Sequence, residues 1–237
     1  MRLGKCSLVV SLLTLPAFAQ SASVSSEDLL LLVKARVVGI GQGVTFRIEN
    51  QSNKSVFVNP DGWSVYRGSK VIRKPLGTET GMLLAAWSTK EWTWGQKNDQ
   101  GNQVSPGLYR VEFTGSSAGP LSDEFVIAPN SSAPILFKTT KAKYAVGEEV
   151  KFYLLNKSAN ATMANYAPWA IRDAVGPVYI PAVPEIAGIF PVKSHLWTWD
   201  QVDQGGDEVD AGKYNVRLTI KVDGKSKSYT RFFKIAN

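Results

Sequence analysis

His195 is the side chain best suited to catalysis, and it is the only histidine in the 237 residues. A Ser-His-Asp triad would have to use it, because histidine serves as the general base in such triads. However, the sequence contains no G-x-S-x-G nucleophile turn, no H-E-x-x-H zinc motif and no glycine-rich phosphate loop. We therefore interpret His195 as a strand histidine beside a tryptophan strand, and we predict that the protein is not an enzyme.

Carboxylates gather in one further segment, the loop from Asp200 to Asp210, which also contains Asp203, Asp207 and Glu208. Several oxygens in a short loop suit calcium. The spacing fits no EF-hand, however, and the aligned segment 95–105 has Gly, Asn, Asn, Gln and Ser at the matching positions. No pair of carboxylates is singled out for glycoside hydrolysis. We predict no metal and no cofactor, with calcium in this loop as the weaker alternative.

The acidic loop belongs to a segment that occurs twice. Glu91–Thr114 aligns without gaps with Leu196–Thr219, and 10 of 24 positions are identical. Further upstream, Gly41–Ser52 matches Gly147–Ser158. A unit of about 100 residues is therefore present in two copies, a period that indicates tandem domains rather than a solenoid.

Each unit has the pattern of a β protein. Apolar and polar residues alternate in Val44–Ile48, Val150–Leu154, Leu108–Phe113 and Tyr214–Ile220. Turn signals recur along the chain, and Asp223-Gly224 predicts a tight hairpin because both residues tolerate a positive φ. Only Ser25–Arg36 shows a weak helical period.

The predicted fold class is all-β, with two tandem immunoglobulin-like antiparallel β-sandwich domains. The first domain is expected over residues 27–128 and the second over residues 135–237. The short polar segment 129–134, flanked by prolines, is the predicted linker.

The repeated V-x-x-G-x-Y-x-V motif spans residues 104–111 and 209–216. Tyr109 follows Gly107 by two residues at the start of an alternating strand, and Tyr214 follows Gly212 in the same way. This is the layout of a tyrosine corner, in which the hydroxyl bonds back to the backbone. We expect the glycines to supply a backbone conformation that a side chain forbids.

Paired tryptophans precede this motif. Trp92 and Trp94 are two residues apart, as are Trp197 and Trp199, so each pair lies on one face of a strand. We predict that Trp94 and Trp199 are core anchors. Two tryptophans on one face exceed what a core often takes, so Trp92 and Trp197 are candidate contact residues.

A tryptophan, a glutamine, a polar loop with glycine and the V-x-x-G-x-Y-x-V motif follow one another in each repeat. This combination resembles the BsuPI family, named for an intracellular proteinase inhibitor of bacilli. It comprises Trp94-x-Gln96, Gly101 and Val104-x-Pro106-Gly107-x-Tyr109, and again Trp199-x-Gln201, Gly206 and Val209-x-Ala211-Gly212-x-Tyr214. The second copy departs from the family by having Ala211 in place of proline. The resemblance covers the last third of each repeat. It implies an immunoglobulin-like fold and a protein partner, with a protease as the first candidate; Gln96 and Gln201 are expected to serve the adjacent turn.

An inhibitor that binds like a substrate needs an exposed, rigid loop. The candidate loops are Arg67–Pro75, with Arg67, Lys70 and Arg73 as contact residues, and Pro177–Pro184, with Tyr179. An ordinary hairpin and a proline-rich edge are the alternative interpretations of these segments.

A second function stays open, that of a structural or adhesive module of the cell envelope. Such a module would bind polysaccharide or another envelope protein, and exposed aromatics such as Trp63, Trp87 or Trp169 would contact the polysaccharide. Exposure of these tryptophans would favour this function, whereas their burial would favour a structural role for them.

The N-terminus has the form of a secretory signal peptide. Arg2 and Lys5 precede an apolar run that ends in Ala17-Phe18-Ala19, and this predicts cleavage between Ala19 and Gln20. The chain is therefore expected to be secreted or periplasmic, and no later stretch is long enough to span a membrane. The only cysteine, Cys6, lies within the signal. The net charge of +7 is scattered along the chain, so we predict no nucleic-acid partner; the oligomeric state is left open.

Overall fold

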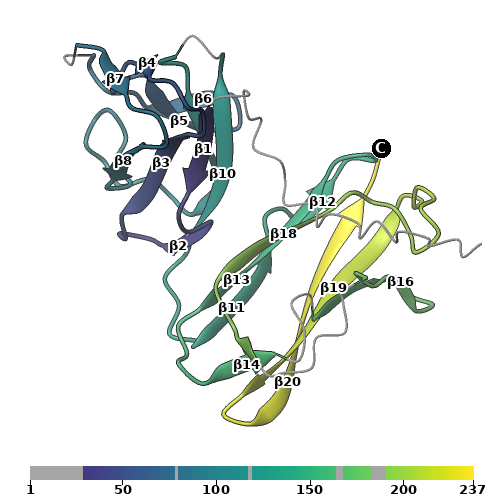
Figure 1. The fold of residues 1–237 in the computed structure, drawn as a ribbon. Coiled ribbons are helices and arrows are strands. Elements are labelled where there is room, and N and C mark those ends of the chain that lie inside the picture. The colour runs from purple at the N-terminus through teal and green to yellow at the C-terminus, as the bar shows by residue number, and fades with distance from the viewer. Residues whose placement is uncertain (1–28, 78–79, 117–118, 164–167, 183–189) are drawn as a thin grey trace, which may run out of the picture.

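A computed structural model describes residues 29–77, 80–116, 119–163, 168–182 and 190–237 (Figure 1). Every regular element within these ranges is a strand, which confirms the predicted all-β class. In the same ranges there is no helix of the length and apolarity that crossing a membrane requires. The predicted signal peptide, with Ala19 and Gln20 at its cleavage site, lies outside the described residues.

The first half of the chain forms two sheets and a small strand pair. Its strands are β1 (Leu29–Val33), β2 (Val37–Gly39), β3 (Val44–Asn50), β4 (Val56–Val58), β5 (Trp63–Arg67), β6 (Lys70–Arg73), β7 (Met82–Leu84), β8 (Thr89–Trp94), β9 (Gly107–Phe113) and β10 (Leu121–Ala128). One sheet has the order β1-β3-β8 and the other the order β2-β10-β9-β5-β6. All pairs are antiparallel except β2 with β10, and β4 pairs with β7 apart from both sheets.

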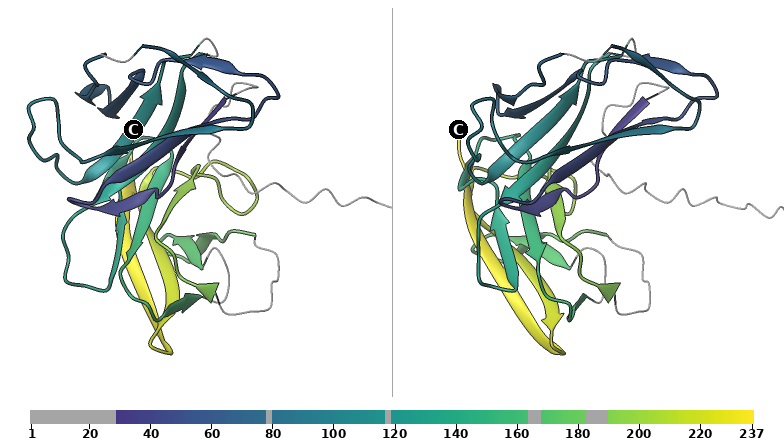
Figure 2. Two further views of the ribbon diagram at one scale, coloured as in Figure 1. Left: turned by 60° about the vertical axis from the view of Figure 1, so that its left-hand side comes forward. Right: turned by 90° about the vertical axis from the view of Figure 1, so that its left-hand side faces the viewer.

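The second half repeats this plan. Its strands are β11 (Ile135–Thr139), β12 (Lys143–Tyr144), β13 (Val150–Asn156), β14 (Ala161–Met163), β15 (Trp169–Arg172), β16 (Pro177–Tyr179), β17 (Phe190–Pro191), β18 (His195–Trp199), β19 (Gly212–Val222) and β20 (Lys225–Ile235). The order β11-β13-β18 matches β1-β3-β8, and β12 runs parallel to β20 as β2 does to β10. Figure 2 shows the long β19–β20 hairpin in two further views.

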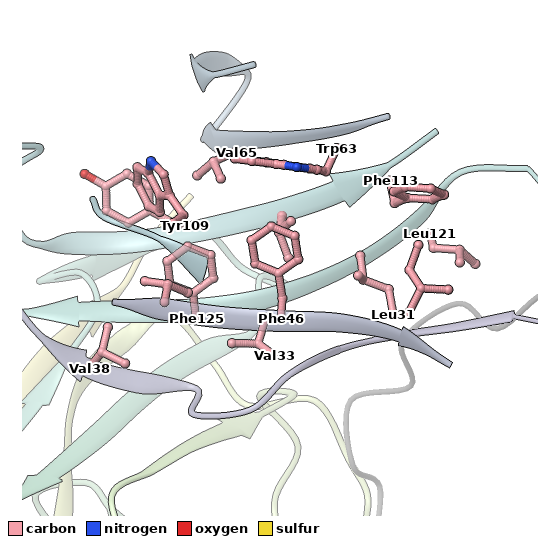
Figure 3. Packing of buried hydrophobic residues seen from close by; sticks show 14 of the residues in the cluster. Leu31, Val33, Val38, Phe46, Trp63, Val65, Tyr109, Phe113, Leu121 and Phe125 are labelled. Carbon is pink, nitrogen blue, oxygen red and sulfur yellow. The ribbon is translucent and has the colours of Figure 1, made fainter. Parts of the chain in front are cut away.

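Each half encloses a core between its two sheets. In β3 the alternate residues Val44, Phe46 and Ile48 are fully buried, because the side chains of a strand point to opposite faces in turn. Figure 3 shows Phe46, Tyr109 and Phe125 packed between the layers of the first half. A separate buried cluster fills the second half, around residues such as Phe152 and Trp199. The arrangement is consistent with β-sandwiches.

The two cores are joined through a third, smaller cluster. It combines Val37 and Val126 from the first half with Leu136 and Tyr153 from the second. Burial here raises the pKa of the Tyr153 hydroxyl to about 12. An ion pair between Lys151 and Glu124 crosses the same junction. Between the halves, residues 129–134 connect the end of β10 to the start of β11.

Candidate functional site

The second tryptophan of each pair is the last residue of its strand and directly precedes the repeated loop. Trp94 is the last residue of β8, and its indole Nε1 donates to the carbonyl oxygen of Lys97 at 2.8 Å. Trp199 ends β18 and donates in the same way to Val202, also at 2.8 Å. Both rings are buried, and Trp94 packs against Tyr109 with 6.1 Å between ring centroids. Their indoles therefore anchor the loop on the core and present no ring face to a partner.

Trp92 and Trp197 lie on the same face as the buried tryptophans. The rings stack on Phe46 and Phe152, with centroids 5.8 Å apart in each case. Both tryptophans are half-buried and pack against the edge of their core. One face of each indole is therefore taken up by the protein, and a contact role for either residue stays a prediction.

Gln96 was expected to serve a turn, and its amide binds the backbone of a turn that is far away in the sequence. Its Oε1 accepts from the backbone N–H of Gly41 at 2.8 Å. Its Nε2 donates to the carbonyl oxygens of Gly39 and Gln42 at 2.9 and 2.6 Å. These three groups belong to the turn between β2 and β3. The amide is fully buried, so it fixes that turn to the repeated loop.

Gln201 makes the equivalent bonds in the second half. It accepts from the N–H of Gly147 at 3.0 Å and donates to Ala145 and Glu148 at 2.7 and 2.5 Å. Gln96 and Gln201 both have a positive φ, 57° and 61°. A left-handed backbone conformation at a glutamine costs free energy, and the buried hydrogen bonds of the side chain offset that cost. The glutamines thus hold two loops together in each half.

The two tyrosines have the geometry of tyrosine corners. The Tyr109 hydroxyl donates to the carbonyl oxygen of Ser105 at 2.5 Å, and that of Tyr214 donates to Asp210 at 2.8 Å. Gly107 has a φ of 157°, which side chains rarely allow. Gly212 has no such φ, contrary to expectation. A Cβ on Gly212 would lie 3.3 Å from the Tyr214 ring, so lack of space disfavours a side chain at this position.

One carboxylate in the acidic loop of the second half, that of Asp203, binds within the loop itself. Asp203 Oδ1 accepts from the backbone N–H groups of Gly205 and Asp207 at 2.8 and 3.1 Å. In the first half Asn98 accepts from Gln100 and Asn102 in the same pattern. Among the described residues, no three His, Cys, Asp or Glu side chains gather as metal ligands would. Asn98 and Asp203 thus shape the same turn in the two halves.

His195 is the first residue of β18, and its ring contacts the ring of Trp197. Its ring lies 4.7 Å from the Trp197 ring, between centroids. Partial burial lowers the pKa of the imidazole below 6.5, and the positive charge of Arg36 lowers it further. No hydroxyl or carboxylate among the described residues forms a hydrogen bond with the ring, so the geometry does not prepare it as a general base.

The lowered pKa of His195 predicts a pH dependence of stability. Below pH 6.5 the unfolded chain takes up a proton more readily than the folded chain, so stability falls as the pH decreases through this range. The thermal midpoint should drop between pH 7 and pH 5.5, and His195→Gln should remove part of that drop. The chain has one histidine, so its imidazole NMR signal gives the pKa directly; a pKa above 6.5 would contradict the prediction.

The segment Arg67–Pro75 contains the turn and second strand of the β5–β6 hairpin, and it is tied to the repeated loop. The Arg67 guanidinium donates to the Ser105 hydroxyl and to the carbonyl oxygen of Pro106. At the other side Asp99 accepts from the Arg73 guanidinium at 3.3 Å and from the Lys74 backbone at 3.1 Å.

Of the three basic candidates in this segment, only Lys70 is left available. Arg67 and Arg73 are committed to the contacts just described. The Lys70 side chain is exposed beside exposed Val71, and its ammonium group makes no ion pair or hydrogen bond with the described part of the chain. Asp99, the aspartate that fixes the hairpin, was not among the residues predicted from the sequence.

The other candidate loop, Pro177–Pro184, is described only up to residue 182. Tyr179 is half-buried in β16, and its ring lies 5.8 Å from the Trp169 ring. It packs against the core of the second half. Its contacts therefore favour a packing role over that of a protruding contact residue.

The three tryptophans considered for polysaccharide binding differ sharply in exposure. Trp63 and Trp169 are 8% and 7% exposed, so both are core residues. Trp87 is 71% exposed and has a positive φ of 57°. Only Trp87 can therefore offer a ring face to a partner.

No protein-family model and no curated protein matches the chain. The resemblance to the BsuPI family therefore stays a prediction. Among solved structures, a β-glucosidase from Listeria innocua is similar to 43% of this chain and 16% of its own, at 19% identity and a TM-score of 0.26. This chain thus spans about a sixth of that protein's length.

Two further solved structures align with a larger part of this chain, also with low sequence identity and low TM-scores. The alpha-2-macroglobulin of E. coli matches 86% of this chain and 14% of its own, at 14% identity and a TM-score of 0.30. The YadV chaperone matches 87% of this chain and 100% of its own, at 12% identity and a TM-score of 0.38. At these values, we draw no functional conclusion from any of the three.

Proposed function

We propose that this chain is a secreted or periplasmic binding protein without enzymatic activity, built from two immunoglobulin-like sandwiches. Its partner is a protein that contacts the segment Arg67–Pro75, and a secreted protease is the first candidate. The observation that supports this most is the anchoring of this segment by Arg67 on one side and by Asp99 on the other.

The anchored segment has the properties that a substrate-like inhibitor needs. A loop already held in one conformation loses little entropy on binding, so more of the contact energy appears as affinity. Two lysine side chains of this segment, those of Lys70 and Lys74, are exposed and make no ion pair or hydrogen bond with the described part of the chain, and Lys70 directly follows the turn. A lysine presented in this way fits a protease whose specificity pocket contains a carboxylate and accepts basic residues. We therefore assign the partner to the trypsin-like class of specificity.

The test is a titration of the mature chain against a panel of secreted proteases, with serine proteases of trypsin-like, chymotrypsin-like and subtilisin-like specificity and one metalloprotease. We expect inhibition of the trypsin-like enzyme while the chain stays intact. Lys70→Ala should weaken inhibition at least about 100-fold, because an anchor residue at the centre of an interface dominates its affinity.

The matched control for this variant is Lys225→Ala, which removes an exposed lysine at the turn of the β19–β20 hairpin. It should leave inhibition unchanged. Absence of inhibition at micromolar protein, or cleavage after Lys70 at the rate of an ordinary substrate, would contradict the proposed function.

One observation favours a second function, that of an envelope module that binds polysaccharide. Trp87 exposes 71% of its surface in a turn that polar side chains surround. Tryptophan is enriched at interfaces because its ring is apolar and its N–H is polar, so this exposed indole is a candidate contact residue. The two functions use different residues and can therefore be tested separately.

A further inference from the structure

The turn between β7 and β8, residues 85–88, holds Trp87 in an unfavourable conformation. A φ of 57° places this tryptophan in the left-handed region, where a bulky side chain is disfavoured. Glycine would adopt this conformation without cost. An exposed tryptophan in a strained conformation contributes little to the fold, which points to a use of the side chain outside it.

The second half does not repeat the turn that carries Trp87. Asn50 Nδ2 donates to the carbonyl oxygens of Leu84 and Ala85, and the equivalent Asn156 Nδ2 donates to that of Val192 at 2.6 Å. Buried Val192 therefore corresponds to the residues before the turn and not to Trp87. The second half connects β17 to β18 through residues 192–194, which include no tryptophan.

The turn that carries Trp87 is held firmly. The buried Asn50 directs its Nδ2 to the carbonyl oxygens of Leu84 and Ala85, at 3.1 and 2.9 Å. Its backbone N–H donates to the Ser88 carbonyl at 2.9 Å. The Ser88 hydroxyl donates to Ala85 at 2.7 Å, inside the turn. The indole is thus presented on a fixed backbone, which limits the entropy that binding would cost.

Beside the indole lies a shallow hollow of about 480 Å³ that is open to solvent, lined by Glu49, Asn50, Gln51, Trp87, Ser88 and Thr89. The side chains of Gln51 and Thr89 form no hydrogen bond with the described part of the chain and are free to bind a ligand. Glu49 is paired with Arg47 at 2.5 Å. The hollow therefore combines one aromatic face with unused donors and acceptors.

We infer that this hollow is a subsite for a neutral pyranose unit of a polysaccharide. The C–H face of a pyranose can pack on the indole, whose ring face is electron-rich, while sugar hydroxyls bond to Gln51 and Thr89. The lining residues include a carboxylate and no lysine or arginine, which disfavours an acidic sugar. The inference rests on the second function proposed above and is independent of protease inhibition.

The test is affinity electrophoresis of the full chain in gels that contain a neutral β-glucan, a galactomannan or polygalacturonate. We expect at least one neutral polysaccharide to retard the protein and Trp87→Gly to weaken that retardation at least tenfold. Trp87→Gly should also keep or raise the thermal midpoint, because glycine relieves the strained φ. Leu76→Ala, which removes another exposed apolar side chain, is the control that should bind as the wild type does.

Three results would overturn the inference. They are retardation by polygalacturonate alone, no retardation by any of the three polymers, and equal retardation of the wild type and Trp87→Gly. The last result would reject this subsite but leave polysaccharide binding in place, whereas the second would reject both. Protease inhibition should be unchanged in Trp87→Gly, and retardation should be unchanged in Lys70→Ala, so each failure can be recognised.

Discussion

Trp199→Ala is expected to lower the free energy of unfolding by about 3–5 kcal/mol, the range for removal of a large buried aromatic. The indole is 2% exposed and packs against Tyr214 and Phe233, with ring centroids 6.1 and 6.3 Å away. Its loss leaves a cavity at the centre of the second core and also removes the hydrogen bond to Val202. Chemical denaturation monitored by fluorescence and circular dichroism measures the change.

Trp197→Ala, in the same strand, is the matched control. Trp197 is only half-buried at the edge of the core, so its removal should cost clearly less, about 1–2 kcal/mol. Equal losses for the two variants would show that Trp199 is not the main anchor of this sandwich.

Gln96→Ala is expected to cost about 2–4 kcal/mol, although glutamine is rarely a core residue. Alanine would leave the N–H of Gly41 and the carbonyl oxygens of Gly39 and Gln42 without their buried partner. It would also keep the strained left-handed φ without compensation. Urea denaturation of the variant and the wild type gives the difference.

Gln103→Ala provides the comparison for this variant. Gln103 is exposed, and its amide donates to the Gln96 side chain at 3.1 Å. Because that bond is accessible to water, its loss should cost less than about 1 kcal/mol. A loss as large as that of Gln96→Ala would mean that the loop, rather than the Gln96 amide, determines the effect.

The sequence predicted those features of the fold that depend on local pattern. Alternation in Val44–Ile48 predicted a strand with one buried face, which the structure has. Asp223-Gly224 predicted a tight hairpin, and both residues have a positive φ, 51° and 76°. The weak helical period near Leu29 was misleading, because β1 is instead paired antiparallel with β3. Four consecutive leucines carry no clear period, so pairing with a neighbour decides the structure.

Contacts between distant segments could not be predicted from pattern. Gln96 was expected to serve its own turn, yet it bonds to a turn more than 50 residues earlier. Asp99, which fixes the hairpin, is a loop residue that no pattern singles out. Asn50, which holds the Trp87 turn, ends β3 and has the counterpart Asn156 in the repeat, but the repeat does not say which carbonyl oxygens it binds. Trp63, Trp87 and Trp169 look alike in the sequence, and only the packing separates the exposed one from the two buried ones.

The central claim is that the repeated tryptophan, glutamine and tyrosine hold their loops in one conformation. This rigid part of the fold then positions the β5–β6 hairpin and Trp87. Amide hydrogen exchange of the wild type and Gln96→Ala tests it most directly. The amides of Gly41 and Val104 should be strongly protected in the wild type and lose protection in the variant, while Gly147 and Val209 keep theirs. Fast exchange of Gly41 and Val104 in the wild type would contradict the claim.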